Sequence, residues 1–340
     1  MGKLLVSYLA PEDEWLAARR DGIGASEISA VFGVSPWQSP FSLYHSKREG
    51  WELTDTDHME AGRRMEPVIA DWFADRGDPL GNLSIQRAGL YQSEERPWQL
   101  ATPDRLVYLR CPECDGIGDT AEYDFEACAD CHGTGGTGEP LAVLECKHPF
   151  DWHGFGEEGT NQIPIYYLMQ VLQQLDVVGV DEWFLAAYAD HQFRIYRGRR
   201  DEADLRVMRI KGAEFWDRYQ RGIEPDLDTH EATVDTLKRL HPSIEDVDVV
   251  VPVEFAEGYR RARALAAKAD ALVDRYQARA RALLGNARRL MCNGKLVVSR
   301  SVYERDGEDY DLHALDEGRP IVDRLNPGRS ATYLLPSRRA

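Results

Sequence analysis

Apolar and polar residues follow two different periods in the first two-thirds of the chain. Apolar side chains recur every three or four positions over residues 61–73 and 164–179, and this spacing predicts amphipathic helices. Shorter apolar runs at 106–109, 141–144 and 183–188 have the length of buried strands. Because helical and strand patterns alternate along the chain, we predict an α/β fold.

The last third of the chain has a different pattern. Residues 226–252 are acidic and contain prolines, which predicts a linker after a core of residues 1–225. Apolar residues then recur in steps of three and four from residue 255 to residue 287, as in a long amphipathic helix. A strand pattern with Asn-Gly and Asp-Gly turns follows, so we expect residues 253–340 to form a helix and a β-hairpin. The arginine-rich face of this helix suits DNA or a partner, but a solvated face of a helix packed on the core is favoured.

Charge is distributed unevenly along the chain. The formal net charge of −17 argues against a protein that coats nucleic acid. Residues 251–340 nevertheless carry 17 Lys and Arg against 12 Asp and Glu, so the acidic balance lies in the first 250 residues. The first residues contain no long apolar segment and no apolar run reaches the length of a membrane span, so we expect a cytoplasmic protein without a membrane partner.

Two carboxylates and one lysine lie at the ends of predicted strands. Asp104 directly precedes one apolar run, and Glu145 and Lys147 end another. Residues two apart in a strand share a face, so Glu145 and Lys147 point to one side and Cys146 points to the other. If the two segments pair as antiparallel strands, Asp104 meets this acid and this lysine at one sheet edge.

This combination suits metal-assisted hydrolysis of a phosphodiester. Carboxylate oxygens hold Mg²⁺, which lowers the pKa of a bound water and neutralises charge on the phosphate. A lysine beside them orients the water and stabilises the developing negative charge. The alternative is a solvated pair of opposite charges on a strand, because a Glu-x-Lys triplet is common in a chain of this length.

Two upstream segments have both a structural and a functional interpretation. Small residues at 22–25 lead to Ser26, which predicts a loop and a helix N-cap, but Ser26 and the nearby Arg19 also suit an anion. Local physics alone favours the plain cap. Glu66 lies near the start of the helix predicted over 61–73, where it is either a glutamate stabilised by the helix dipole or an acid directed at the metal site.

Four of the six cysteines form two copies of the pattern Cys-x-x-Cys-x-Gly-x-Gly. Four thiolates suit tetrahedral Zn²⁺, and the glycines let backbone amides approach the sulfurs. An iron–sulfur cluster is the alternative, but the glycine pattern favours one structural zinc ion. The repeats resemble the zinc knuckles of the DnaJ co-chaperone family, which implies a structural element. The proposed ligands are Cys111, Cys114, Cys128 and Cys131.

The cysteine segment, roughly residues 110–139, separates Asp104 from Glu145. Without it about ten residues would remain between the two acids, which is a normal hairpin connection. We therefore expect the knuckle to be an insertion at a hairpin tip, close to the acidic site but outside it.

The order of these motifs resembles the YqaJ-type viral recombinases, relatives of phage lambda exonuclease in the PD-(D/E)xK nuclease superfamily. The resemblance covers about residues 13–220 and implies a restriction-endonuclease-like core, with a central mixed sheet flanked by helices. It also implies a phage or prophage protein in a bacterial host and a trimeric homo-oligomer. The residues that carry it are Arg19, the loop at 22–26, Glu66-Pro67, Asp104, Glu145-x-Lys147 and Tyr167-x-x-Gln170.

The resemblance implies a role for each residue of the metal centre. Asp104 and Glu145 would bind two Mg²⁺ ions, with the Cys146 carbonyl as a further ligand and Mn²⁺ as a substitute metal. Lys147 would act on the attacking water.

The resemblance also assigns the surrounding residues. Glu66 would support the metal site, and Tyr167 and Gln170 would line it. Arg19 and Ser26 match positions that hold the DNA 5′-phosphate, and this match favours the anion site over the plain cap.

Together these features predict a Mg²⁺-dependent exonuclease that degrades one strand of linear double-stranded DNA from a 5′-phosphorylated end. The product is a 3′ overhang for a single-strand annealing recombinase. One rival is a sequence- or structure-specific endonuclease on the same core, and the predicted 5′-phosphate pocket argues against it. The other is a zinc-stapled adaptor that binds DNA or protein through a vestigial nuclease fold, and the filled catalytic positions argue against that.

Overall fold

A computed structural model describes residues 2–51, 56–77, 82–116 and 127–300, together with the backbone of short strands between residues 302 and 336. The chain forms two compact units, Met1–Ile244 and Glu245–Ala340, which we describe one at a time. Within the described stretches, no helix combines the length and the apolar character needed to cross a membrane.

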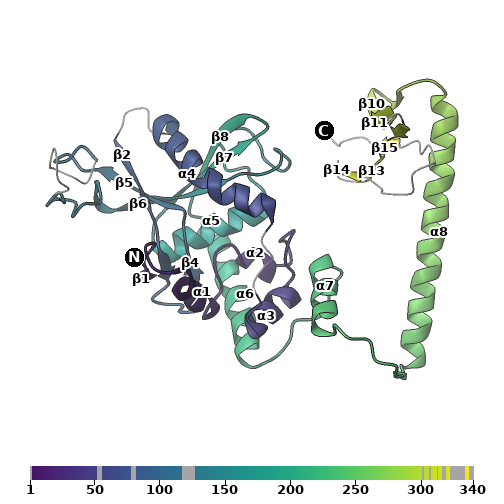
Figure 1. The fold of residues 1–340 in the computed structure, drawn as a ribbon, viewed down its shortest axis with the longest axis horizontal. Helices are drawn as coiled ribbons and strands as arrows, with labels where there is room; N and C mark the ends of the chain where they lie inside the picture. Colours follow the sequence, from purple (N-terminus) through teal and green to yellow (C-terminus); the bar gives the residue numbers. More distant parts are fainter. Residues whose placement is uncertain are drawn as a thin grey trace. The chain divides into compact units, whose positions relative to one another are not determined.

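A five-stranded mixed sheet forms the centre of the first unit, in the order β2-β5-β6-β7-β8 (Figure 1). β6 and β7 run parallel and are connected through helix α5, whereas the other neighbouring strands are antiparallel. This arrangement confirms the predicted α/β core with a central mixed sheet and flanking helices. The elements are β2 (Leu83–Arg87), β5 (Arg105–Arg110), β6 (Gly136–Lys147), α5 (Ile165–Val178), β7 (Glu182–Ala189) and β8 (Gln192–Arg199).

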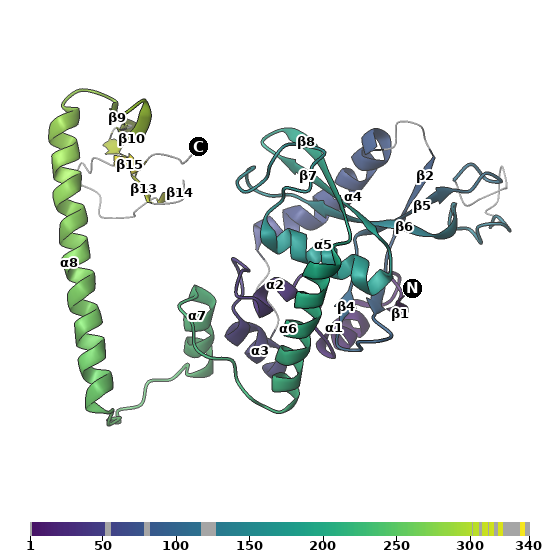
Figure 2. The same ribbon diagram turned by 180° about the vertical axis from the view of Figure 1, so that it is seen from behind.

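Helices cover both faces of this sheet. α5 packs on one face together with α2 (Ile28–Val31) and α6 (Glu202–Gln220), and α5 lies in front of the sheet in Figure 2. α4 (Asp57–Gly77) packs on the other face. Successive residues of β6 therefore meet different helices, with Glu145 on the α5 side and Cys146 on the α4 side.

A smaller sheet completes the amino-terminal part of the first unit. Its strands β1, β3 and β4 pair in that order, and α1 packs beside β1. Ser39 and Ser42 form a capping box that begins α3. The elements are β1 (Lys3–Val6), α1 (Glu12–Arg20), α3 (Pro40–Glu49), β3 (Leu90–Gln92) and β4 (Leu100–Ala101).

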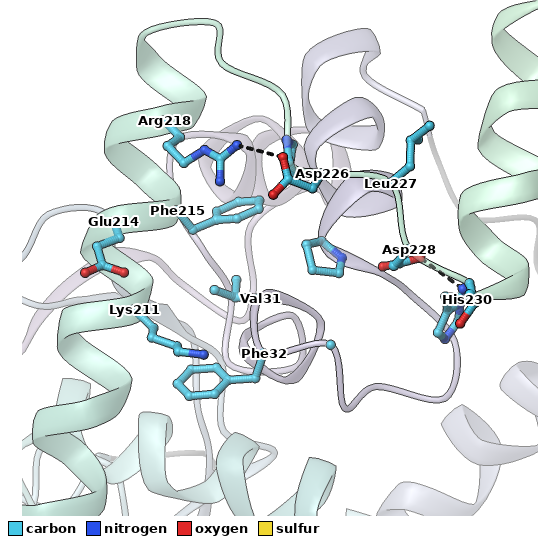
Figure 3. Close-up of a pocket in the computed structure, with 14 residues that line it drawn as sticks. Val31, Phe32, Lys211, Glu214, Phe215, Arg218, Asp226, Leu227, Asp228 and His230 are labelled. Atoms are coloured by element: carbon cyan, nitrogen blue, oxygen red, sulfur yellow. Dashed lines mark hydrogen bonds and ion pairs between the residues drawn. The ribbon is translucent and has the colours of Figure 1, made fainter. Parts of the chain in front are cut away.

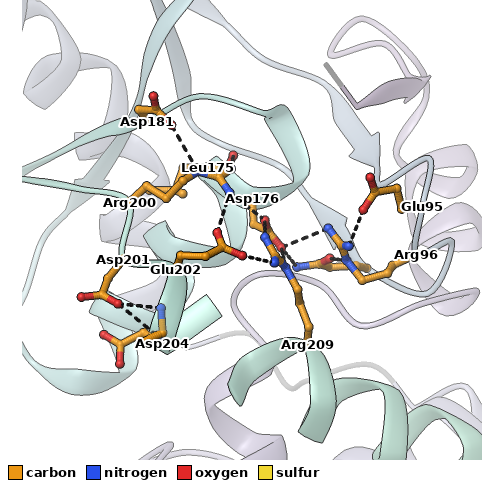
Figure 4. Close-up of polar contacts among 12 residues, drawn as sticks. Glu95, Arg96, Leu175, Asp176, Asp181, Arg200, Asp201, Glu202, Asp204 and Arg209 are labelled. Carbon is orange, nitrogen blue, oxygen red and sulfur yellow. Dashed lines mark hydrogen bonds and ion pairs between the residues drawn. The ribbon is translucent and has the colours of Figure 1, made fainter. Parts of the chain in front are cut away.

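Asp176, near the end of α5, ties together several elements of this unit (Figure 4). Its carboxylate accepts hydrogen bonds from Arg209 on α6 and from Gln99, and it forms ion pairs with Arg96 and Arg200. Burial alone would raise the pKa of Asp176, but these donors outweigh burial and lower it. The network fixes α5 against α6 and against the loop before β4.

The segment predicted as a linker contains a helix, α7 (Glu231–Leu240). The Thr233 hydroxyl donates to the Ser39 hydroxyl at 2.6 Å, so α7 packs on the start of α3. The first compact unit accordingly extends to Ile244. The acidic composition of this segment suggested a linker. The helix was missed because its packing depends on contacts with residues distant in sequence.

The second unit is built on a long helix, α8 (Val253–Leu284), which matches the predicted helical period. Asn293 and Gly294, both with positive φ, form the tight turn between β9 and β10. The strands are β9 (Arg289–Cys292), β10 (Lys295–Arg300), β11 (Val302–Arg305), β12 (Glu308–Asp311), β13 (His313–Leu315), β14 (Arg319–Ile321) and β15 (Leu334–Pro336).

Candidate active site

Asp104 and Cys146 meet where β5 begins and β6 ends. β5 and β6 pair antiparallel, with Arg105 opposite Leu144, so the residue before β5 lies beside the last residues of β6. The backbone N–H of Cys146 donates to Asp104 Oδ2 at 2.7 Å. The antiparallel pairing on which the sequence prediction depended is therefore confirmed.

Glu145 and Lys147 lie at the same edge and face α5. Lys147 Nζ is 2.5 Å from Glu145 Oε1, and the Glu145 side chain is 2% exposed. Two amide groups of α5 also donate to this carboxylate, Gln170 to Oε1 and Gln174 to Oε2. The structure thus brings together Asp104, Glu145, Lys147 and Gln170, and it adds Gln174.

Gln174 is a site residue that the sequence analysis missed. It lies four residues after Gln170, a spacing that places both side chains on one helical face. This spacing was the available signal. Both amides orient Glu145 without neutralising it, because a glutamine carries no charge.

The electrostatics of this cluster leave it short of positive charge. Burial and the Glu145 carboxylate raise the pKa of Asp104 well above its usual range, although Lys147 acts in the opposite direction. Burial disfavours the charged form of Lys147, but Glu145 and Asp104 outweigh burial and raise the pKa of this ammonium. Two carboxylates therefore share one cation.

The donor set fits a divalent metal ion. A carboxylate offers about four lone-pair positions, and the three donors on Glu145 leave one of them for a cation. Asp104 and the Cys146 carbonyl supply further hard oxygen atoms, which Mg²⁺ and Mn²⁺ prefer. A cation would also neutralise the carboxylate pair that raises the pKa of Asp104.

Glu66 stands apart from the other two acids. Its Oε1 is 2.6 Å from Arg105 Nη1, so an ion pair occupies this carboxylate. α4 begins at Asp57, so Glu66 lies in the middle of the helix, and the prediction of a first-turn position was wrong. The helix dipole therefore does not explain Glu66. The charge of Glu66 also acts on Asp104, in the direction that raises its pKa.

Tyr167 lies over Lys147, as expected for a residue that lines the site. The Lys147 ammonium is 5.2 Å from the centre of the Tyr167 ring, within cation–π distance. Burial raises the pKa of Tyr167, so its hydroxyl stays protonated. Trp37, which is 60% exposed, packs against Tyr167 and Tyr166.

Arg19 and Ser26 are in contact in the structure, but they have further partners. Arg19 Nη2 donates to Ser26 Oγ at 2.8 Å and lies 3.3 Å from Glu27. Lys47 reaches Glu27 at 2.8 Å from α3. Burial would raise the pKa of Glu27, but Lys47 and Arg19 outweigh burial and lower it. Two cations around one carboxylate leave one net positive charge for an anion.

Ser26 is not a helix cap. The N-cap of α2 is Glu27, without a side-chain cap, and α2 has four residues. The Glu27 carboxylate instead accepts the N–H of Gly24 at 2.7 Å and closes the loop on itself. The expected N-cap was wrong because the hydroxyl of Ser26 accepts from Arg19.

Buried polar contacts connect this loop to the acidic site. Gln173 of α5 donates to the carbonyl groups of Ile23 and Leu100 at 2.7 and 2.9 Å. The Trp15 indole, which also faces Arg19, donates to Thr102 Oγ1 at 3.4 Å. Thr102 precedes Asp104 by two residues, so the contacts of Trp15 and of the Ile23 loop reach the same short segment as Asp104.

The four predicted zinc ligands come together. The sulfur atoms of Cys111, Cys114, Cys128 and Cys131 all lie within 4.8 Å of one another, and all four residues are buried. Two of the sulfur pairs are separated by 3.8 and 3.6 Å. Thiolates about 2.3 Å from a tetrahedral zinc ion are about 3.8 Å apart, so the geometry fits zinc.

The two halves of the cysteine cluster repeat the same backbone conformation. Asp115 and Gly116 have φ values of 50° and 79°, and His132 and Gly133 have 54° and 81°. The N–H of Gly135 donates to the Cys131 sulfur at 3.2 Å. Burial would raise the pKa of this thiol, but the Gly135 N–H and neighbouring thiols lower it to about 6.

The cysteine cluster lies at the hairpin tip but not close to the acids. Arg110 pairs with Gly136 at the far end of β5, and Asp104 precedes its near end. A strand advances about 3.3 Å per residue, so roughly 20 Å separates the two sites. The expected proximity was wrong, because the tip and the base of a hairpin are its opposite ends.

A cavity of about 580 Å³ lies away from the acids, between α2, α6 and the segment before α7 (Figure 3). Val31, Phe32 and Phe215 provide apolar surface, and Lys211 lies over the Phe32 ring. None of the predicted site residues lines it. The size of this cavity therefore does not make it the candidate active site.

Residues 14–181 match the family described as the YqaJ-like viral recombinase domain. The matched region contains Arg19, the three acids, Lys147 and Gln170. This part of the chain is therefore similar to a domain of this family, as its motifs indicated.

Two relatives extend this match. The uncharacterized protein YqaJ of Bacillus subtilis strain 168 is 25% identical over 240 residues, which are 69% of this chain and 65% of that protein. The uncharacterized protein R354 of Acanthamoeba polyphaga mimivirus is 25% identical over 184 residues, which are 53% of this chain and 29% of that protein. The chain thus spans less than two-thirds of the length of either relative.

Solved structures of exonucleases also resemble the chain. LHK-Exo, an alkaline exonuclease from Laribacter hongkongensis solved in complex with dAMP, aligns with 68% of this chain and 98% of its own, at 18% identity and a TM-score of 0.44. A phage-related exonuclease from Haemophilus somnus 129PT aligns with 59% of this chain and 95% of its own, at 8% identity and a TM-score of 0.38.

Proposed function

We propose that this protein is a Mg²⁺-dependent exonuclease that degrades the 5′-ended strand of linear double-stranded DNA and leaves a 3′ overhang. The observation that carries the proposal is the meeting of Asp104, Glu145 and Lys147 at one sheet edge, with an under-neutralised carboxylate pair. The YqaJ-like viral recombinase domain supports the same setting, because recombination uses processed DNA ends. The 3′ overhang would serve a single-strand annealing recombinase.

In this mechanism Asp104, Glu145 and the Cys146 carbonyl would hold the metal ions. When bound, Mg²⁺ activates a water molecule and neutralises charge on the scissile phosphate. Lys147 remains protonated because its pKa is raised, so it orients the water and stabilises negative charge instead of accepting a proton. Gln170 and Gln174 keep Glu145 in position.

The reaction regenerates its own substrate end. Water oxygen bonds to the phosphorus between the first two nucleotides, and the bond from that phosphorus to the 3′ oxygen of the first nucleotide breaks. The first nucleotide leaves as a 5′-monophosphate with a free 3′-hydroxyl. The shortened strand again carries a 5′-phosphate. Arg19, Ser26 and Lys47 would bind this phosphate, because the two cations exceed the single charge of Glu27.

We also propose that one Zn²⁺ ion occupies the four cysteines as a structural element. Four buried thiols leave no open ligand position for catalysis. Zinc analysis of the purified chain should give one ion per chain in wild type and none in Cys111→Ser. Full zinc loading of Cys111→Ser would contradict this assignment.

The decisive test compares 5′-phosphorylated linear duplex with covalently closed circles, in Mg²⁺ and in EDTA. Wild type should release mononucleotides from linear DNA only, and EDTA or Lys147→Met should abolish release. Lys211→Met, which removes a lysine from the cavity of Figure 3, is the matched control and should retain activity.

A second comparison locates the end pocket. Arg19→Gln should lose the preference for a 5′-phosphate over a 5′-hydroxyl end, whereas Arg20→Gln, on the same helix, should keep it. Cleavage of closed circles would establish an endonuclease instead. Absence of metal-dependent cleavage on every DNA substrate, from folded and zinc-loaded protein, would refute the nuclease proposal.

A further inference from the structure

A stack of rings follows the catalytic lysine along the chain. Phe150, three residues after Lys147, lies parallel to His58 of α4, with ring centres 4.0 Å apart and an angle of 12°. His58 in turn stacks with His148 at 6.1 Å, and His148 stacks with Tyr188 of β7 at 6.1 Å. The stack therefore joins the start of α4, the segment after β6 and the end of β7.

The outer ring of this stack faces solvent. Phe150 is 80% exposed although one face of its ring is covered by His58. The Phe150 ring is therefore shielded from water by His58 on one face only. The contact with His58 fixes its orientation, and Pro149 restricts the backbone before it. The free face is a preformed flat surface.

A cavity of about 280 Å³ adjoins the stack. It is lined by His58, His148, Phe150 and Tyr188 and by the turn residues Asp190 and His191. Both turn residues have positive φ, 48° and 60°, where glycine would be less strained. The volume lies just below the range of pockets that hold drug-sized ligands, so it suits one planar ring system.

We infer that this stack and its cavity bind an unpaired nucleobase of the DNA substrate, stacked on Phe150. The inference rests on the proposed nuclease function and adds a subsite for single-stranded DNA beside the site of cleavage. Every nucleobase has a flat face that stacks on aromatic rings, so the contact needs no particular sequence.

The position of the stack supports this occupant. β6, which ends at Lys147, and β7, which carries Tyr188, are neighbouring strands about 4.8 Å apart. Glu145 and Lys147 face α5, whereas His148 follows Lys147 and lies on the α4 side. A strand that passes over this sheet edge would place its scissile phosphate on one side and a base from a neighbouring nucleotide on the other.

The test measures stacking separately from cleavage. The full-length chain with Asp104→Asn is mixed with a duplex whose 5′-phosphorylated strand ends in a short unpaired 5′ overhang, which carries 2-aminopurine at one unpaired position after another. Binding should quench the fluorescence of at least one unpaired position. Adding Phe150→Ala should abolish this quenching and weaken binding of the overhang duplex on the order of tenfold, whereas Phe150→Tyr should preserve both.

Controls separate this site from a general loss of DNA binding. Tyr8→Ala removes a half-exposed ring elsewhere and should change neither signal, and blunt duplex should bind equally well to the Phe150→Ala chain. Equal quenching with the Phe150→Ala and Phe150→Tyr chains, or no quenching with any chain, would overturn the inference. Cleavage by wild type without Phe150-dependent quenching would overturn it while leaving the nuclease proposal intact. Phe150-dependent quenching without cleavage would support the base-binding site and contradict the nuclease proposal.

Discussion

Asp176 and Asp104 are two carboxylates of the same unit with opposite surroundings. Asp176, near the end of α5, is 1% exposed and is surrounded by three arginines and one glutamine (Figure 4). Among the charged groups near Asp104, Glu145 has the largest effect on its pKa, and the two acids share Lys147. The pKa of Asp176 is lowered, and the pKa of Asp104 is raised.

The difference separates a structural carboxylate from a candidate metal ligand. Three arginines contact Asp176 directly, so its ionised form is stable without any further partner. At Asp104 and Glu145, the donors from α5 are neutral amides, and the negative charge stays incompletely balanced. A buried site that lacks positive charge gains most from binding a cation.

Asp104→Asn should give the largest effect on activity and the smallest cost in stability. Loss of a metal ligand should reduce the rate of DNA cleavage by on the order of 10³-fold. The same substitution removes repulsion from Glu145, so the melting temperature of metal-free protein should rise or stay unchanged. Cleavage assays and calorimetry on the same preparation check both halves. A large fall in melting temperature would show that Asp104 is a structural residue like Asp176.

Asp176→Asn should give the opposite result. The substitution removes the one buried carboxylate that three arginines share and leaves them only the exposed acids Glu95, Asp181 and Glu202. It should lower the free energy of unfolding by about 3–5 kcal/mol. Below its melting temperature, the variant should cleave DNA at close to the wild-type rate. Urea unfolding and cleavage assays measure the two quantities.

The matched control for this prediction is Asp181→Asn. Asp181 is exposed and pairs with the same Arg200 at 3.3 Å, so its loss should cost less than about 1 kcal/mol. Equal losses of stability in the two variants would contradict a special role for the Asp176 network.

The pH dependence of stability should separate the two carboxylates. The pKa of Asp104 is raised in the folded state, so its contribution is present at low pH and is lost as pH rises through that pKa. The pKa of Asp176 is lowered, so its contribution is present above the unfolded-state pKa and is lost as pH falls through the folded-state pKa. Unfolding of metal-free wild type, Asp104→Asn and Asp176→Asn across pH checks both signs.

Added Mg²⁺ sharpens this comparison. A cation at Asp104 favours the ionised carboxylate, so saturating Mg²⁺ should remove the loss of stability with rising pH. The concentration of Mg²⁺ needed for half of this effect should fall as pH rises, because protons compete for the same oxygen atoms. A response to Mg²⁺ that is the same in wild type and in Asp104→Asn would refute the assignment of Asp104 as a ligand.

The sequence predicted those parts of the molecule that depend on local pattern. The period of apolar residues predicted α5 and α8, and the strand runs on either side of the cysteines predicted the antiparallel β5–β6 pair. The alternation of side chains along a strand placed Glu145 and Lys147 on one face. These inferences need only neighbours in sequence or a known period.

The sequence could not show contacts between elements that are distant along the chain. Nothing local indicates that Glu27 binds Lys47, that Arg105 pairs with Glu66 or that Asp176 gathers arginines from three segments. These pairs decide whether the negative charge of a buried carboxylate is balanced, and this balance distinguishes Asp176 from Asp104. Helix α7 was not predicted either. The acidic composition of its segment is typical of a linker, and its packing on α3 depends on contacts distant in sequence.

The smallest predicted effect concerns two adjacent glutamines of α5. Gln174→Leu removes one neutral donor from Glu145, so the carboxylate should be less well oriented and the cleavage rate should fall by roughly tenfold. The apparent affinity for Mg²⁺ should change by less than the rate, because Asp104 and Glu145 remain. Cleavage rates over a range of Mg²⁺ concentrations measure both quantities.

Gln173→Leu is the matched control, because the hydrogen bonds of Gln173 are made to backbone groups away from Glu145. Its amide binds the carbonyl groups of Ile23 and Leu100 and does not touch Glu145. This substitution should lower the free energy of unfolding by about 1–3 kcal/mol and weaken discrimination for a 5′-phosphate, since the loop carrying Ser26 loses its anchor. Its Mg²⁺ dependence should match wild type. If the two variants behaved alike, the neutral amides would hold α5 in place and would not act on Glu145.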